Sequence, residues 1–163
     1  SGNSGGWMSE ATSLDAKGSE RRQEVAFIAG GAEGVGLECA RLLSSRGAAV
    51  ALFDRSAEML RGVAGELHSA GITALTISGA IDVPEDVERA MQSVAESFGR
   101  ITTIVTCNAF DVPGTVDAID LRLWNDCLRN GLSGVFNVAH SGIRFLLDGG
   151  GSFVAVAAGC SSA

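Results

Sequence analysis

From residue 24 onward, short apolar runs alternate with longer segments in which apolar residues recur at helical spacing. The apolar runs predict strands at 25–29, 49–53, 72–77, 101–106 and 153–158. The periodic segments predict helices at about 34–46, 57–70, 84–98 and 121–147. A strand followed by a helix and then by another strand is the repeating unit of a parallel sheet. The sequence therefore predicts an α/β fold with a parallel sheet.

Particular residues mark the ends of these helices. Ser56 stands where its side chain can cap the second helix, and Pro84 suits the first turn of the third helix. Gly47 and Gly71 follow the last periodic residues of the first and second helices, where glycine commonly ends a helix. These signals set the predicted helix boundaries.

The last predicted strand, 153–158, is apolar on both faces, which is typical of a strand inside a parallel sheet. Only residues 159–163 follow it in this sequence. Natural sheets avoid an exposed apolar edge. We therefore expect a further part of a longer polypeptide, a second chain or a dimer partner to cover this strand.

The first predicted strand runs into a glycine cluster at positions 30, 31, 34 and 36. Glycine accepts positive φ and lets a backbone approach a diphosphate, and the free N–H groups of the next helix attract its negative charge. A dinucleotide site also needs an acidic residue about 20 positions further on to bind the adenosine ribose, and Asp54 stands there. The alternatives are a plain strand-to-helix connection at the glycines and an ordinary helix-capping role for Asp54.

The acidic residue also bears on the choice of cofactor. A carboxylate at this place repels the additional phosphate of NADP, so the sequence favours NAD over NADP. The neighbouring Arg55 weakens that preference because its positive charge attracts phosphate.

The 163 residues fit one globular domain, which we expect at 24–163, and the 46% of hydrophobic residues can form a core. Residues 1–7 resemble a cloning remnant before Met8, and we expect the polar segment up to residue 23 to be a disordered arm. The formal net charge of −7 argues against nucleic acid as a partner. No apolar stretch reaches the roughly 20 residues of a membrane helix and no signal peptide is present, so we expect no membrane association and a cytoplasmic protein.

The four cysteines, Cys39, Cys107, Cys127 and Cys160, are far apart in the sequence and form no CxxC pair. We expect reduced thiols that pack as small buried apolar side chains, with neither a disulfide nor a metal site. His68 and His140 have no partner at metal-ligand spacing, so we assign them no function.

Several segments share the pattern of one family over most of 24–158. Residues 29–36 read AGGAEGVG, residues 82–83 read DV, residues 107–110 read CNAF, and a long helix follows near Trp124. These segments resemble the TGxxxGxG turn, the adenine-contacting Asp, the NNAG motif and the interface helix of the short-chain dehydrogenases/reductases. The leading Thr of the first motif is replaced by Ala29, and the first Asn and the Gly of NNAG are replaced by Cys107 and Phe110.

The resemblance implies a Rossmann-like, doubly wound parallel sheet with strand order 3-2-1-4-5 that lacks the C-terminal strands of the family. It also implies a set of cofactor-binding residues at the strand ends. Those expected at the diphosphate are Gly30, Ala32, Glu33, Gly34, Val35 and Gly36. Those expected at the adenosine ribose, the adenine and the second ribose are Asp54, Arg55, Asp82, Val83, Asn108 and Ala109.

The catalytic residues of the family, unlike its cofactor-binding motifs, have no clear counterparts in this sequence. There, a Tyr hydroxyl exchanges a proton with the substrate, supported by a Lys, a Ser and an Asn. This chain has no Tyr, and by the family's pattern the Tyr and Lys would lie beyond residue 163. Gly131, next to Asn130, stands at the Asn position, and Ala158 stands at the Ser position, where only a rearranged loop would let Ser161 or Ser162 substitute.

Two functional hypotheses follow. The first is the cofactor-binding half of an NAD-dependent oxidoreductase that acts on an alcohol or carbonyl substrate and forms a homo-oligomer through the helix from Trp124 to Leu147. The second is a non-catalytic nucleotide-binding or assembly subunit of the same fold. In both cases we expect the chain as given to be inactive.

Overall fold

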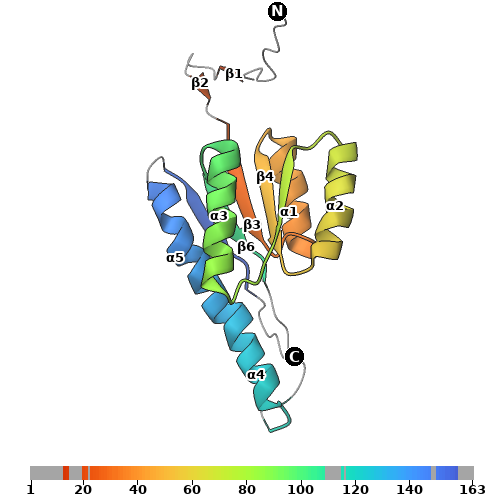
Figure 1. Cartoon of the computed structure of the whole chain (residues 1–163), viewed down its shortest axis with the longest axis vertical. Helices are drawn as coiled ribbons and strands as arrows, with labels where there is room; N and C mark the ends of the chain where they lie inside the picture. Colours follow the sequence, from red (N-terminus) through yellow and green to blue (C-terminus); the bar gives the residue numbers. More distant parts are fainter. Residues whose placement is uncertain are drawn as a thin grey trace, which may run out of the picture.

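The computed structural model describes residues 13–14, 20–21, 23–108, 115, 117–147 and 150–157. Its central element is a parallel sheet with the strand order β5-β4-β3-β6-β7 (Figure 1). The strands are β3 Val25–Ala29, β4 Ala49–Asp54, β5 Ala74–Ser78, β6 Thr103–Thr106 and β7 Ser152–Ala155. Counted along the chain from β3, the order is 3-2-1-4-5, which confirms the predicted Rossmann-like α/β fold.

Helices cover both faces of this sheet (Figure 1). On one face lie α1 Gly34–Ser45 and α2 Ala57–Ser69; on the other lie α3 Pro84–Phe98 and α5 Gly134–Leu147. Successive side chains of a strand point to opposite faces. In β3, Ala26 and Ile28 therefore join the core under α1 and α2, whereas Phe27 joins the core under α3 and α5.

The centre of the sheet is held by two stacked aromatic rings. Phe27 of β3 and Phe53 of β4 are fully buried, and their ring centroids are 5.8 Å apart. Burial of an aromatic side chain of this size stabilises the fold by about 1.5–3 kcal/mol. The pair therefore fixes β4 against β3, and with it the position of the residues at the ends of both strands.

The signals for the helix ends are confirmed. The Ser56 side chain accepts a hydrogen bond from the Met59 N–H at 3.2 Å, and Pro84 occupies the first turn of α3. Gly47 and Gly71 follow α1 and α2 with φ of 90° and 73°, in the left-handed region that glycine adopts without strain.

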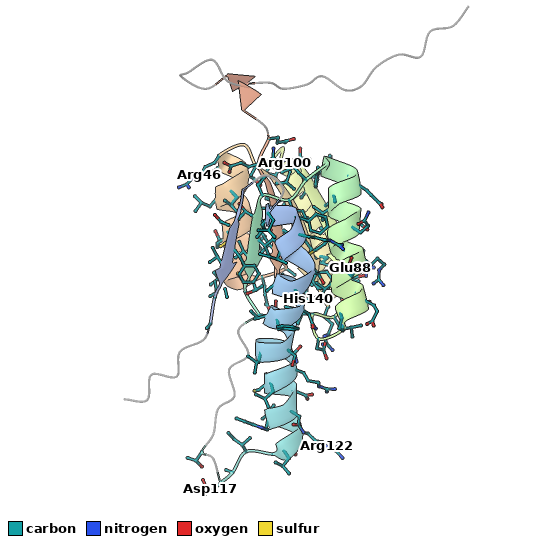
Figure 2. The ribbon with its side chains drawn as sticks, turned by 90° about the vertical axis from the view of Figure 1, so that its left-hand side faces the viewer. Arg46, Glu88, Arg100, Asp117, Arg122 and His140 are labelled. Carbon is teal, nitrogen blue, oxygen red and sulfur yellow. The ribbon has the colours of Figure 1, made fainter. Side chains whose placement is uncertain are left out.

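The single helix predicted for 121–147 is wrong in its middle section. The structure has α4 Leu121–Cys127, then a π-helix, η1 Leu128–Ser133, and then α5. A π-helix closes its hydrogen bonds over one more residue than an α-helix, so it changes the direction of the apolar stripe. In Figure 2, Asp117 and Arg122 lie near the start of α4, at the end of the molecule opposite Arg46 and Arg100.

The column formed by α4 and η1 extends past the carboxyl edge of the sheet (Figure 1). Large apolar side chains on α4, η1 and α5 are exposed. They are Leu121, Trp124, Leu128, Leu132, Phe136, Ile143 and Leu147. The apolar pattern along 121–147 therefore marks a surface as well as a core, whose buried part includes Val138 and Leu146.

Two strands begin later than the apolar runs predict, β5 at Ala74 and β6 at Thr103. The Ile72 N–H still donates to the Leu67 carbonyl at the end of α2, at 2.9 Å, so it is not available to the sheet. Ile101 is buried although it precedes β6. Apolar character here reports burial in the core and not participation in a strand.

The exposed apolar edge expected at the last strand is present in the described residues. β7 is the outer strand of the sheet, and Phe153 and Val154 are partly exposed. Its described bounds, Ser152–Ala155, begin earlier and end earlier than the predicted 153–158, and Ala158 lies outside the described residues.

The remaining described strands are β1 Ser13–Leu14 and β2 Glu20–Arg21, which pair with each other in antiparallel orientation. They fall within residues 1–23, for which the sequence predicts an arm. Among the helices that the structure describes, none combines the length and the apolar character that crossing a bilayer requires.

Candidate functional site

The glycine turn lies between the end of β3 and the start of α1 and is held by tight backbone contacts. Gly30 has φ of 75°, and its N–H donates to the Phe53 carbonyl at 2.9 Å. A Cβ on Gly30 would lie 3.0 Å from the Cys107 carbonyl carbon and 3.1 Å from Asn108 Oδ1. A Cβ on Gly36 would lie 2.0 Å from the Gly30 carbonyl oxygen. Both positions therefore need glycine, and α1 packs directly on the turn.

The start of α1 leaves backbone donors without a side-chain partner. Glu33 is the N-cap residue, and its side chain makes no capping hydrogen bond. The Leu37 N–H donates to the Glu33 carbonyl at 3.2 Å, so the N–H groups before it have no acceptor within the helix. Gly34 has φ of 53° and open space around its Cβ position, and Val35 is exposed. This end of α1 can accept a negatively charged group.

Asp54, the last residue of β4, lies beside the turn. Its Oδ2 accepts a hydrogen bond from the Ala32 N–H at 3.3 Å, and its Oδ1 accepts one from the Ser56 N–H at 3.1 Å. The carboxylate therefore joins the end of β4 to the glycine turn and to the start of α2. Ser56 is the N-cap residue of α2, so Asp54 supports the start of α2 through the Ser56 N–H and does not cap the helix itself. Each carboxylate oxygen keeps a lone pair for a further donor.

Arg55 and Asp82 form an ion pair across the same edge. Arg55 Nη2 donates to Asp82 Oδ1 at 2.6 Å and to Asn130 Oδ1 of η1 at 3.3 Å. The Asp82 side chain is 15% exposed, whereas the Arg55 side chain is 64% exposed. Val83 follows as the N-cap residue of α3. The arginine is thus directed at Asp82 and at η1.

The end of β6 brings the third group of side chains to this edge. The Cys107 N–H donates to the Ala29 carbonyl at 2.8 Å, which aligns residues 107–108 with the start of the glycine turn. Thr106 Oγ1 and Asn108 Oδ1 are buried, and within the described part of the chain neither has a hydrogen-bond partner. Ala109 lies outside the described residues. The buried oxygen of Asn108 is an acceptor with unused capacity next to Gly30.

The position predicted to replace the family's Asn lies on the π-helix. Gly131 belongs to η1, and a Cβ there would meet no atom within 4 Å. The adjacent Asn130 donates through Nδ2 to the Asp126 carbonyl at 2.8 Å and accepts from Arg55 through Oδ1. Asn130 therefore links η1 to the strand ends, a role that its place in the sequence does not reveal.

The sequence also does not reveal that Cys39 influences Cys107. Burial, followed by the Cys39 thiol, raises the pKa of Cys107 to about 11. Both thiols are free, as expected. The expected burial is only partial, because Cys39, Cys107 and Cys127 are half-buried.

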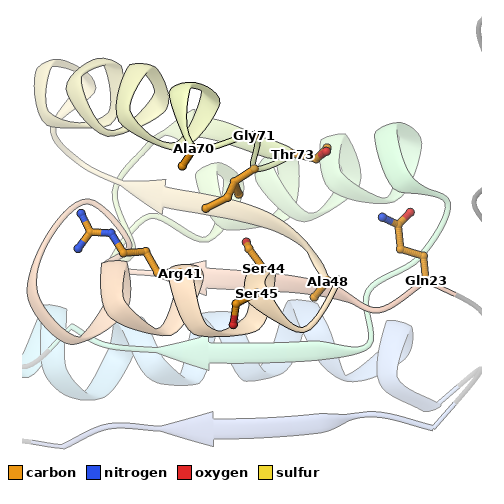
Figure 3. Close-up of a pocket in the computed structure, with 10 residues that line it drawn as sticks. Gln23, Arg41, Ser44, Ser45, Ala48, Ala70, Gly71 and Thr73 are labelled. Carbon is orange, nitrogen blue, oxygen red and sulfur yellow. The ribbon is translucent and has the colours of Figure 1, made fainter.

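A cavity of about 380 Å³ lies at the opposite edge of the sheet, between the C-terminal ends of α1 and α2 (Figure 3). Arg41 is its charged lining residue, and it is ion-paired with both Glu38 and Glu66. Because that charge is already compensated and the cavity is remote from the glycine turn, it adds nothing to the site at the carboxyl edge.

The parallel sheet, the glycine turn after its first strand and the acidic residue after its second define the Rossmann type of α/β domain. A family model for the short chain dehydrogenases matches residues 24–162. The chain therefore belongs to the short-chain dehydrogenase family, and the resemblance of its motifs to that family is confirmed.

Relatives of known sequence or structure are similar along most of the chain. The peroxisomal 2,4-dienoyl-CoA reductase [(3E)-enoyl-CoA-producing] of Arabidopsis thaliana is 26% identical over 146 residues, which cover 84% of this chain and 49% of that protein. The 2,5-dichloro-2,5-cyclohexadiene-1,4-diol dehydrogenase LinX of Sphingobium indicum is 30% identical over 132 residues, which cover 80% and 53%. The structure of F189W actinorhodin polyketide ketoreductase with NADPH matches with a TM-score of 0.78 at 29% identity, over 82% of this chain and 52% of that one. The chain spans about half the length of these relatives.

Proposed function

We propose that this chain binds NAD(H) at the carboxyl edge of its sheet, as the cofactor-binding part of an oxidoreductase for a small alcohol or carbonyl substrate. The position of Asp54 carries the proposal. Its carboxylate lies against the glycine turn and accepts the Ala32 N–H at 3.3 Å, with lone pairs left for the ribose hydroxyls. The phosphate of NADP at the same place would meet the carboxylate charge.

The residues at this edge fit a dinucleotide. The N–H groups at the start of α1 that lack an acceptor can bind a diphosphate. Because Gly36 packs closely on Gly30, no side chain there keeps the diphosphate away from the backbone of the turn. The unpartnered oxygen of Asn108 can accept a hydroxyl or amide proton from the ligand. When bound, the nicotinamide supplies hydride-transfer chemistry, and the protein residues hold and orient it.

The ion pair of Arg55 favours NAD over NADP in this proposal. Its guanidinium is already bound to Asp82 at 2.6 Å and contacts Asn130. To hold an additional phosphate, Arg55 would share its guanidinium between that phosphate and the Asp82 carboxylate, whose negative charge already compensates part of the positive charge. The arginine next to Asp54 therefore does little to offset the repulsion of phosphate by that carboxylate.

Fluorescence titration with NADH and NADPH tests the proposal. Loss of hydrogen bonds to a charged group costs about 1.5–3 kcal/mol, so Asp54→Ala should weaken NADH binding about tenfold or more and affect NADPH less. Glu58→Ala, which removes an exposed carboxylate on α2, is the matched control and should bind NADH as the unmodified chain does. Failure of the unmodified chain to bind either dinucleotide at millimolar concentration would contradict the proposal.

A non-catalytic nucleotide-binding or assembly subunit is the second candidate function. The observation that favours it is Gly131, because glycine at this place in η1 offers no side chain to a substrate or a water molecule. Turnover assays with alcohols and ketones, on a natural polypeptide that continues past residue 163, separate the two candidates. Measurable NAD-dependent turnover supports the oxidoreductase, and its absence in a chain that binds NADH supports the subunit.

We propose in addition that the helical segment from Trp124 to Leu147, in α4, η1 and α5, is a homo-oligomer interface. Leu132 and Phe136 are 67% and 64% exposed, and Trp124 is half exposed. Large apolar side chains exposed along one segment are typical of protein interfaces. The cytoplasmic location stays a prediction from the sequence.

A further inference from the structure

Asn130 is a residue of η1 that contacts the arginine next to Asp54. Its Nδ2 donates to the Asp126 carbonyl at 2.8 Å, and its Oδ1 accepts from Arg55 Nη2 at 3.3 Å. The reverse orientation of the amide would set two donors against each other at Arg55 and two acceptors against each other at Asp126. The contacts on both sides therefore hold the Asn130 oxygen toward the guanidinium.

One nitrogen of Arg55 makes both contacts with this edge of the sheet. Nη2 donates to Asp82 Oδ1 at 2.6 Å as well as to Asn130 Oδ1. Nη2 has two hydrogen atoms, so the two acceptors can engage both of them. The Asp82 side chain is 15% exposed, and Asn130 is half-buried. The guanidinium of the more exposed Arg55 is therefore anchored through its Nη2 atom.

Nη2 is the nitrogen that a guanidinium needs in order to bind a phosphate through two parallel hydrogen bonds. One edge of the planar group presents Nε together with Nη2, and the other presents Nη1 together with Nη2. Two-point binding of this kind is what makes arginine a strong phosphate ligand. With both Nη2 hydrogens engaged by Asp82 and Asn130, Arg55 has neither pair free. A phosphate can then accept only single hydrogen bonds from it.

We infer that Asn130 is a specificity-determining residue of the dinucleotide site, because it holds Arg55 in a position that keeps the guanidinium from binding the additional phosphate of NADP. This inference rests on the proposed function. Asn130 acts on the choice of cofactor through Arg55, so it is a positioning residue. The Asp54 carboxylate repels the additional phosphate by its charge. Asn130 adds to this preference for NAD by withholding the cation that follows Asp54 in the sequence.

Titration of an Asn130→Ala variant with NADH and NADPH tests the inference. The substitution leaves Asp82 in place and frees one Nη2 hydrogen, which restores one of the two phosphate-binding edges of Arg55. We expect the ratio of the Kd for NADPH to the Kd for NADH to fall by about threefold or more, through tighter binding of NADPH. Asn125→Ala, which removes an exposed amide from α4, is the matched control and should leave the ratio unchanged.

A double variant separates positioning from a merely structural role. In an Arg55→Ala background, Asn130→Ala should leave the ratio unchanged, because no guanidinium remains to be released. If Asn130 only supported the fold, its removal would weaken the binding of both dinucleotides alike in both backgrounds, and the inference would be overturned. NADH binding with no change of the ratio in Asn130→Ala would contradict this inference alone. An unmodified chain that binds neither dinucleotide would refute the proposed function, and the inference with it.

Discussion

The contact between Gly36 and Gly30 gives a sharp test of how α1 is seated. In Gly36→Ala, the new Cβ would lie 2.0 Å from the Gly30 oxygen and 2.9 Å from the Gly30 carbonyl carbon. Both atoms are backbone, so α1 itself must move. Overpacking of this kind costs about 1–3 kcal/mol, against a gain in helix propensity of at most about 1 kcal/mol. We expect a net loss of up to about 2 kcal/mol in the free energy of unfolding.

Gly62→Ala is the matched control for this variant. Gly62 lies inside α2, and a Cβ there meets no atom within 4 Å, so only the propensity gain of about 1 kcal/mol remains. Urea unfolding should show opposite shifts of the midpoint for the two variants. Gly36→Ala should also weaken NADH binding, whereas Gly62→Ala should not. Equal stabilisation by both alanines would refute the account of the turn as a rigid seat for α1.

Three further predictions concern charge and apolar surface. The Ala80 N–H, followed by the neighbouring Arg89 guanidinium, lowers the pKa of Asp86. Asp86→Ala should therefore lower the free energy of unfolding by about 0.5–1.5 kcal/mol at pH 7, and urea unfolding should show this difference disappearing as the pH falls through the lowered pKa. Phe136→Glu places a charge among the exposed apolar side chains of η1 and α5, so sedimentation velocity should show less self-association than in the unmodified chain. Arg144→Met removes an exposed ion pair with Glu88. The free energy of unfolding, measured by thermal melting, should change by less than about 1 kcal/mol.

The fold could be predicted from the sequence because its local signals agree with one another. Apolar runs alternate with periodic segments, and Ser56 and Pro84 begin helices where the periodicity begins. The π-helix η1 could not be predicted in this way. An α-helix and a π-helix over 128–133 would have the same apolar residues, so the apolar pattern does not tell them apart. The contacts that η1 makes, such as that of Asn130 with Arg55, join segments far apart in the sequence.

The candidate site likewise has features that can be predicted from the sequence and features that cannot. The glycine turn and Asp54 could be predicted because their spacing reflects one strand, one turn and one helix of regular length. The effect of Cys39 on the pKa of Cys107 depends instead on tertiary packing, which places both residues against the core under α1 and α2. The direction of the Arg55 side chain toward Asp82 likewise depends on the sheet bringing the ends of β4 and β5 together.

Gly131 allows the last prediction, which bears on whether the fold requires glycine at the position where the sequence predicts a replacement of the family's Asn. Gly131 has no positive φ, and a Cβ there meets no atom within 4 Å. Neither the backbone nor the packing therefore demands glycine. Asparagine is a better helix former than glycine by a few tenths of a kcal/mol, so Gly131→Asn should leave the melting temperature unchanged or slightly raised.

Gly134→Asn, at the start of α5, is the matched control, because a Cβ at Gly134 would lie 2.7 Å from the Ile81 side chain. This variant should be destabilised by about 1–3 kcal/mol. If Gly131→Asn were destabilised to the same degree, glycine at 131 would be a packing requirement of η1. If only Gly134→Asn is destabilised, the described fold can carry the family's asparagine without cost. Glycine at this position would then not be a constraint that the fold imposes.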